Sequence, residues 1–214
     1  QHADVVALQE LSLPAAAQIQ RDLAGDYPYQ MLAPSETFTG TGLLSRYPLD
    51  ALPGNGAAGQ LAQLRLGGTS VALINVSLPG PEIKRRYVPK LGWVDGVGGY
   101  HTSKRTRALK ALLAAVGQQH GPLVVAGDFN LSDREQEYEQ LAAMLHDAYR
   151  EAGWGFGHTF PSRLPPAAGA LALPLIRIDY VWSAGGVAPA AADVACGEWS
   201  DHCMLTTELR VGVD

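Results

Sequence analysis

The chain contains several short apolar runs, and polar residues follow directly after them. Residues 4–8 (DVVAL) lead into the dipeptide QE, and residues 122–126 (PLVVA) lead into the motif GDFN. Valine-rich runs of this length are typical of strands that are buried on both faces of a sheet. Such a chain needs a layered fold that covers these strands, and its polar residues collect where the strands end.

The apolar spacing elsewhere predicts helices and further strands. Strands follow one another both directly and with a helix between them, which indicates α/β layers with a partly antiparallel sheet. The predicted helices cover residues 14–23, 106–116 and 135–145, and the other predicted strands cover residues 42–44, 60–66, 69–76, 176–182 and 204–211. Residues 79–103 and 153–174 are long and weakly patterned, which predicts functional or mobile loops.

Composition limits the class of protein and shows an uneven charge. With 47% hydrophobic and 17% charged residues, the chain is typical of a globular protein, and its net charge of −5 argues against a surface that coats polyanions. Residues 82–110 hold eight basic and two acidic side chains, a net charge of +6, which leaves −11 for the rest. A basic segment on an acidic body indicates a local anion site, although a solvated surface has the same composition.

Two more polar clusters complete a pattern. Asp179 lies within an apolar run, and the motif SDH precedes the last predicted strand. Each cluster alone could be a turn or a helix cap. Together they supply carboxylates, an amide and an imidazole, and oxygen-rich sets of this kind suit Mg²⁺ or Mn²⁺.

Five motifs occur in order along the chain, namely LQE, LSRYP, GDFN, IDYV and SDH. In this order they resemble the endonuclease/exonuclease/phosphatase family, and the segment EAGWGFGHTFP is similar to a bacterial subgroup of that family. The resemblance covers nearly the whole chain and implies one domain over residues 1–214. The fold it implies is a DNase-I-like four-layer α/β sandwich, in which two packed, mainly antiparallel sheets are flanked by helices.

The resemblance also implies an activity, namely hydrolysis of a phosphate ester with Mg²⁺ or Mn²⁺. The ester could belong to a nucleic acid, a nucleotide or a lipid phosphate. Among the matching positions, Asp128 would activate the attacking water, Asn130 and His202 would hold the phosphate, and Asp201 would orient His202. This chemistry fits the residue types, because phosphoryl transfer depends mainly on positioning and on neutralising negative charge.

Two other positions receive supporting roles from the same resemblance. Glu10 matches the family's metal-ligand glutamate, and Asp201 would also touch the metal. Asp179 would support the site from behind, which is consistent with its place in an apolar run, because an unpaired buried carboxylate is costly.

The family's first strand, which carries an asparagine, has no counterpart here, because Glu10 lies nine residues after Gln1. We expect an N-terminally incomplete domain, since loss of a central strand would expose two strand edges. Residues upstream of Gln1 could attach the domain to a membrane, and we expect an extracytoplasmic location rather than a cytoplasmic one. Cys196 and Cys203 flank the SDH motif and could form a disulfide there or remain two buried thiols.

Besides the missing first strand, the chain differs from the family at a histidine that many members carry in an Asn-x-His motif. Here Ser77 takes its place after Asn75. A serine hydroxyl can donate a hydrogen bond but cannot titrate near pH 7. The site could therefore be slow, could use a metal-bound water as the acid, or could recruit Tyr100 or His101. It could also bind a phosphate ligand without turnover as part of a membrane-associated protein.

Substrate recognition is expected at Ser77 and in the long segment that follows it. Aromatic side chains occur among basic ones there and would suit either nucleic acid or a lipid phosphate at a membrane surface. The expected contact residues in the segment are Arg85, Arg86, Tyr87, Trp93 and His101.

Overall fold

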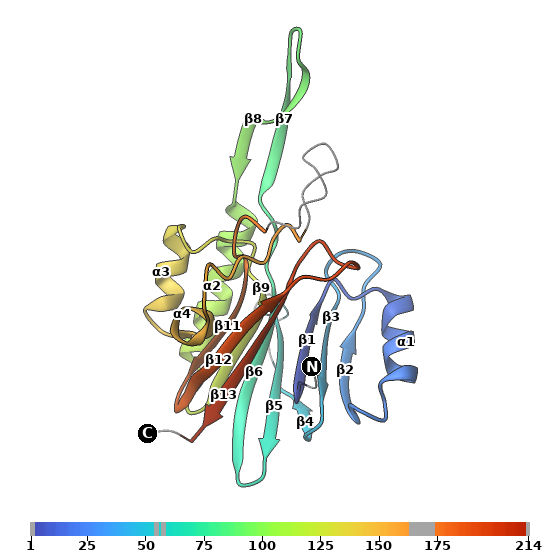
Figure 1. The fold of residues 1–214 in the computed structure, drawn as a ribbon, viewed down its shortest axis with the longest axis vertical. Helices are drawn as coiled ribbons and strands as arrows, with labels where there is room; N and C mark the ends of the chain where they lie inside the picture. Colours follow the sequence, from blue (N-terminus) through green and yellow to red (C-terminus); the bar gives the residue numbers. More distant parts are fainter. Residues whose placement is uncertain (1–2, 54–55, 57–58, 163–173, 213–214) are drawn as a thin grey trace.

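A six-stranded sheet forms the centre of the molecule. The structure, a computed structural model, describes residues 3–53, 56, 59–162 and 174–212 (Figure 1). The strands of this sheet are β4 (Leu49–Ala51), β5 (Gln60–Leu66), β6 (Thr69–Ser77), β9 (Leu123–Asp128), β10 (His146–Asp147) and β11 (Asp179–Ala184). Their order is β10-β11-β9-β6-β5-β4, and every neighbouring pair is antiparallel except β6 and β9.

The second layer of strands consists of two pieces. The strands are β1 (Val5–Gln9), β2 (Tyr29–Ala33) and β3 (Thr41–Ser45), in the order β1-β3-β2, and the hairpin of β12 (Val187–Ala195) and β13 (Met204–Val211). Both pieces pack on one face of the six-stranded sheet, because Leu43 and Val187 share an apolar cluster with Val71 and Leu73. Among the described strands, β1 pairs with β3 alone and β13 with β12 alone.

Strand β6 shows why the sequence produces layers. Val71 and Leu73 point to the second layer of strands, whereas Ala72, Ile74 and Val76 belong to a cluster under the helices. The alternation has the period of two that a strand requires, and both faces are apolar because both are covered. The helices of the molecule are α1 (Leu13–Asp22), α2 (Ser103–Gly117), α3 (Gln136–Ala142) and α4 (Ala148–Ala152), and α2 and α3 supply the helical side of this cluster.

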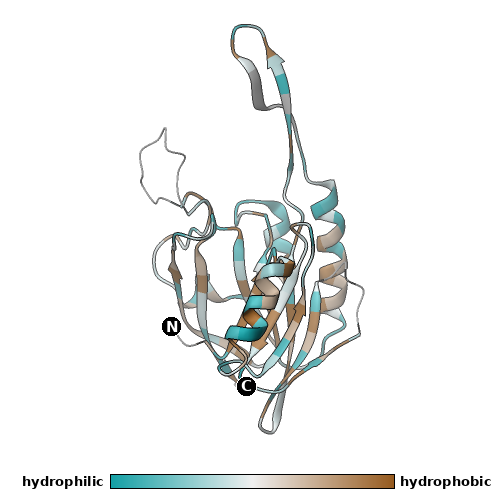
Figure 2. Ribbon diagram, turned by 90° about the vertical axis from the view of Figure 1, so that its right-hand side faces the viewer, coloured by the Kyte–Doolittle hydropathy of each residue, from teal (hydrophilic) through white to brown (hydrophobic). Residues whose placement is uncertain are grey.

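Most predicted elements are present with ends shifted by a few residues, and the predicted α/β sandwich is confirmed. The prediction of a loop at residues 79–103 was wrong. Most of the segment forms the hairpin of β7 (Glu82–Val88) and β8 (Gly92–His101), which projects from the body (Figure 1). Figure 2 shows hydrophilic and hydrophobic residues mixed along it. The strand pattern was missed because most described side chains of the hairpin are exposed, so the sequence does not show the alternation of a half-buried strand.

Other parts of the chain also differ from the prediction. The sequence patterns did not indicate β2, β4, β10, β12 or α4, which are short or carry many small residues. Within the weakly patterned segment 153–174, residues 163–173 lie outside the described part. No helix among the described residues is both long and apolar enough to cross a bilayer.

Candidate active site

Three neighbouring strands bring polar residues into one row at the same end of the six-stranded sheet. In the parallel pair β6–β9, Ser77 lies opposite Asp128. In the antiparallel pair β9–β11, Asp128 lies opposite Asp179. Hydrogen bonding between the strands therefore fixes Ser77, Asp128 and Asp179 side by side, although the first and last are about a hundred residues apart in the sequence.

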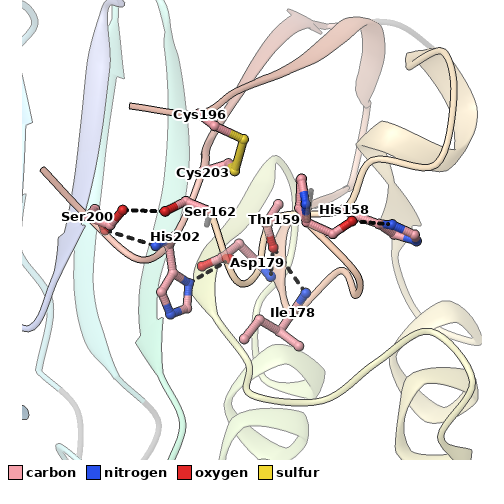
Figure 3. The surroundings of a disulfide bond; sticks show 10 residues. His158, Thr159, Ser162, Ile178, Asp179, Cys196, Ser200, His202 and Cys203 are labelled. Atoms are coloured by element: carbon pink, nitrogen blue, oxygen red, sulfur yellow. Dashed lines mark hydrogen bonds and ion pairs between the residues drawn. A yellow bond between two sulfur atoms is a disulfide. The ribbon is translucent and has the colours of Figure 1, made fainter. Parts of the chain in front are cut away.

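His202 completes this row from the loop before β13. Its Nδ1 atom donates a hydrogen bond of 2.9 Å to Oδ2 of Asp179 (Figure 3). Ligand atoms of Asp128, Asp179 and His202 all lie within 4.8 Å of one another. Since Asp179 holds Nδ1, the Nε2 atom of His202 is the one left to meet a substrate.

The carboxylate that orients His202 is thus Asp179, whereas the family resemblance had assigned this task to Asp201. The side chain of Asp201 is exposed, and its backbone oxygen accepts a hydrogen bond of 2.6 Å from the N–H of Ser162. The negative charge of Asp201 still acts on His202 from nearby. The structure places Asp201 at the rim of the site and Asp179 at its base.

Asn130 holds Asp128 in place. Its backbone N–H donates to Oδ1 of Asp128 at 2.8 Å, and its Nδ2 donates to Oδ2 at 2.7 Å and to the carbonyl of Leu78 at 2.9 Å. Both side-chain N–H bonds of Asn130 are therefore engaged within the protein. Asn130 has a φ of 49°, in the left-handed region that asparagine tolerates better than most residues.

Arg105 fixes Asn130 from the opposite side. Its guanidinium is fully buried, donates to the backbone oxygen of Asn130 and forms an ion pair with Glu135. The sequence carries a signal for this role that was overlooked. Arg105 lies on the same helical stripe as the buried Leu109, Leu112 and Val116, where a charged side chain is unexpected unless it is paired.

Thr159 joins the loop of His202 to the strand of Asp179. It is fully buried, and its Oγ1 accepts hydrogen bonds of 3.2 Å from the N–H groups of Ile178 and Asp179. Its backbone oxygen accepts a bond of 2.7 Å from the N–H of Cys203 (the bonds of Oγ1 are drawn in Figure 3). Thr159 lies in the segment EAGWGFGHTFP that the sequence singled out, but its role was not predicted, because its partners are distant along the chain.

The loop of His202 is closed by a disulfide between Cys196 and Cys203, so the pairing that the sequence left open is formed (Figure 3). Cys203 is buried and Cys196 is exposed. The ring contains the whole SDH motif. Ser162 binds it from outside, since its Oγ donates to the backbone oxygen of Ser200 at 2.6 Å.

Glu10 follows β1, whose end is tied to the central sheet. The Nε2 atom of Gln9 donates to Oδ1 of the buried Asn75 at 2.7 Å, and Nδ2 of Asn75 donates to the carbonyls of Leu8 and Gly42. Glu10 itself is exposed. Its negative charge reaches Asp128, as the electrostatics of that carboxylate show.

The site holds excess negative charge at its base. Burial raises the pKa of Asp128 to about 7, and the charges of Asp179 and Glu10 add to this effect against the hydrogen bond from Asn130 and the charge of His202. Burial also favours the neutral ring of His202. The hydrogen bond and charge of Asp179, with the charges of Asp128 and Asp201, nevertheless raise the pKa of His202 to about 9.

These carboxylates fit a divalent cation. Asp128, only 6% exposed, is destabilised as an anion by burial and by the neighbouring charges of Asp179 and Glu10. A cation on the open side of Asp128 would offset this repulsion, and carboxylate oxygens are the donors that Mg²⁺ and Mn²⁺ prefer.

The expected substrate contacts in the hairpin are placed differently from the rest of the site. His101 ends β8 near the body, whereas Arg86 and Tyr87 are exposed on the outer part of the hairpin. The side chains of Arg85 and Trp93 lie outside the described part of the structure. Arg86 and Tyr87 therefore belong to the projecting hairpin, whereas Ser77, Asp128 and Asp179 belong to the central sheet.

The fold and site together define an α/β sandwich with a carboxylate–histidine site at one end of its central sheet. The model of the endonuclease/exonuclease/phosphatase family matches residues 1–202, and the chain belongs to that family. Members of this family are hydrolases that act on phosphate esters. Among curated proteins, none matches the chain significantly.

Solved structures with the same fold are similar over nearly the whole chain. A family member from Bacteroides vulgatus has 17% identity and a TM-score of 0.68, and the match covers 97% of this chain and 85% of that one. TDP2 from D. rerio, in complex with a single-stranded DNA product, has 17% identity and a TM-score of 0.67, with 97% and 86% covered. Beta toxin from Staphylococcus aureus has 15% identity and a TM-score of 0.65, with 97% and 87% covered.

Proposed function

We propose that the protein is a divalent-metal-dependent phosphodiesterase that hydrolyses its substrate with water. The observation that carries this proposal is the row of Asp128 and Asp179 across β9 and β11 with His202 bonded to Asp179. The set offers a buried carboxylate, a positioned imidazole and a further carboxylate in one place, which are the groups that phosphoryl transfer uses. Membership of the family supports the same reaction.

In this proposal the protein's own groups bind and orient the reactants. Asp128, fixed by Asn130, accepts a proton from the attacking water at a carboxylate oxygen. His202, held through Nδ1, directs Nε2 to a phosphate oxygen. The protonated ring would offset negative charge that spreads over the phosphate in the transition state.

Mg²⁺ or Mn²⁺ would be held by the carboxylates of Asp128 and Glu10, with Asp201 at the rim. When bound, the cation supplies Lewis-acid polarisation of a phosphoryl oxygen. The support for this assignment is the set of negative charges around Asp128 and not the position of an ion.

The experiment is hydrolysis of bis(p-nitrophenyl) phosphate by the full chain with Mg²⁺ or Mn²⁺, compared with excess EDTA. Asp128→Asn and His202→Ala should each lower kcat by about 10²–10⁴-fold. The exposed Asp193→Asn is the matched control and should keep full activity. Unchanged hydrolysis in EDTA, or in either site variant, would refute the proposal.

A second candidate is a phosphate-binding domain without turnover. Ser77 favours it, because Ser77 lies beside Asp128 where many family members have a histidine. Binding of a phosphodiester by wild type, with no hydrolysis in any metal, would support this candidate over the first.

We also propose that the domain works in an oxidising compartment, as an extracytoplasmic domain. The disulfide between Cys196 and Cys203 supports this, because disulfides persist mainly outside the cytosol. Fractionation of cells that express the natural protein, followed by thiol labelling, tests it; free thiols in a cytosolic fraction would contradict it.

A further inference from the structure

The β7–β8 hairpin has a composition that the proposed hydrolysis does not use. Residues 84–94 contain four basic residues and no acidic one. Lys84, Arg86 and Lys90 are exposed there. Glu82, at the foot of the hairpin, forms an ion pair of 2.6 Å with Lys104. The hairpin from the pair of Lys84 and Gly99 outward also includes Asp95 and therefore carries a net charge of +3 on a chain whose net charge is −5.

Large apolar side chains are exposed along the same hairpin. Ile83 is 55% exposed, Tyr87 59%, Tyr100 56% and Leu91, at the tip, 75%. Backbone register places Ile83 opposite Tyr100 across the two strands. In a two-stranded ribbon without a covering layer, such residues remain in water at a cost of about 25 cal/mol per Å². Apolar groups kept exposed in one projecting element indicate a partner surface.

We propose that the β7–β8 hairpin is an arm that docks the protein on an anionic phospholipid bilayer. Arg86 and Lys90, the exposed basic residues nearest the tip, would meet lipid phosphates, and Leu91 would enter the boundary between headgroups and acyl chains. Tyrosine side chains favour the same boundary, because one end of the ring is apolar and the other can bind water.

One observation favours a bilayer over nucleic acid, and a second sets how the protein would approach it. Tyrosines among basic residues suit either partner, but aliphatic side chains such as Leu91 and Ile83 gain stability from hydrocarbon and not from stacked bases. The body opposes approach to any anionic surface, since the chain outside residues 82–110 has a net charge of −11. The uneven charge distribution therefore orients the basic hairpin tip, and not the acidic body, toward the membrane.

The hairpin is also placed to bring the active site near that surface. Ser77 ends β6 five residues before β7 begins, and α2 begins two residues after β8 ends. Ser77 lies opposite Asp128, and Arg105 of α2 holds Asn130. A strand of seven residues spans about 23 Å, and residues 78–81 and the tip add to this length, so docking at the tip would tether the site at a distance from the lipid that the length of the hairpin sets.

The test is co-sedimentation of the full chain with vesicles of phosphatidylcholine alone or with about a quarter phosphatidylserine. We expect binding to the anionic vesicles alone, with an affinity that falls as salt is added. Arg86→Gln with Lys90→Gln should weaken binding about 25-fold, because each basic residue near an anionic membrane contributes about fivefold. Leu91→Asp should weaken binding about 10-fold or more.

Matched controls separate the hairpin from general charge and hydrophobicity. Arg21→Gln with Arg65→Gln removes two exposed basic residues from the body, and Leu13→Asp alters a half-exposed leucine in α1. Both controls should bind like wild type. An unchanged melting temperature confirms that each variant is folded.

Three outcomes would overturn the proposal. They are the absence of wild-type binding to anionic vesicles, equal losses in hairpin and control variants, and binding of single-stranded DNA through the hairpin in place of vesicles. Binding is measured without turnover, so a failure here leaves the proposed hydrolysis intact, and an inactive enzyme could still dock. Hydrolysis of the soluble diester by Leu91→Asp should match wild type.

Discussion

The site end of the central sheet and the β7–β8 hairpin are built on opposite principles. At the site, each polar group is fixed by partners from distant parts of the chain, such as Asp179 with His202 and Asn130 with Arg105. In the hairpin, the strands bond mainly to each other and most described side chains face water. The positions of the site side chains are therefore fixed by contacts between residues distant in the sequence. The hairpin instead presents a surface whose residues can change without disturbing the fold.

The strongest way to break the site is to remove the partner of His202. Asp179→Asn should lower kcat by about 10²–10⁴-fold, because the ring loses its orientation and its charge partner. Asp201→Asn is the comparison variant and should have a smaller effect, since its carboxylate is exposed at the rim. Equal losses in the two variants would contradict the assignment of Asp179.

The same variant changes a titration in the metal-free protein. The pKa of His202 is raised to about 9, so its protonated ring stabilises the fold fully below pH 6.5, and this stabilisation is lost as the pH rises through 9. Asp179→Asn should bring the pKa of His202 down toward its ordinary value. NMR of the imidazole signals measures this shift, and an unchanged midpoint would argue against the hydrogen bond.

A substitution at Arg105 tests whether the fold around the site depends on a buried charge. Arg105→Met should lower the free energy of unfolding by about 3–5 kcal/mol, because Glu135 and the oxygen of Asn130 lose their partner. Arg107→Met, on the exposed side of the same helix, should change it by less than about 0.5 kcal/mol. Urea unfolding followed by circular dichroism distinguishes these outcomes.

A substitution at Ser77 tests whether the site lacks a general acid. Ser77→His should raise kcat about 10-fold or more if the site is active and short of a proton donor beside Asp128. Ser77→Ala, as the control, should not raise it. No gain with the histidine would indicate that another group already serves the leaving oxygen.

The smallest effect is expected from shortening the hairpin. Replacing residues 87–93 by Asn-Gly would join Arg86 to Val94, which are already opposite each other, through a turn that suits two-stranded ribbons. The free energy of unfolding should change by less than about 1 kcal/mol, because none of the described side chains of the removed segment belongs to a buried cluster. A large loss of stability in urea unfolding would show that the hairpin supports the body.

The sequence predicted those parts of the fold whose local pattern matches their environment. Both faces of β6 are buried, and its bounds were predicted to within one residue. The motifs also brought Asp128, Asn130, Asp179 and His202 into one expected site. The hairpin was missed because its residues obey no burial pattern. Thr159 was missed because its function arises only from contacts across the fold, with Cys203 and the start of β11.

The partner of His202 could not be chosen from the sequence either. The family resemblance assigned this role to Asp201, which is adjacent in the chain, whereas the bonded Asp179 is 23 residues away. Successive residues point away from each other in extended chain, whereas a strand neighbour can face the ring directly. The choice therefore depends on how the loop of His202 packs against β11, which no local pattern encodes.

For protein engineering, the points at which the hairpin leaves and rejoins the body define a graft site. Ser77 is held by its pairing with Asp128, and α2 is held through Arg105, so both junctions stay fixed when the segment between them changes. Fluorescent labels, affinity peptides or arms from related proteins could be inserted between residues 86 and 94 while the catalytic residues stay in register.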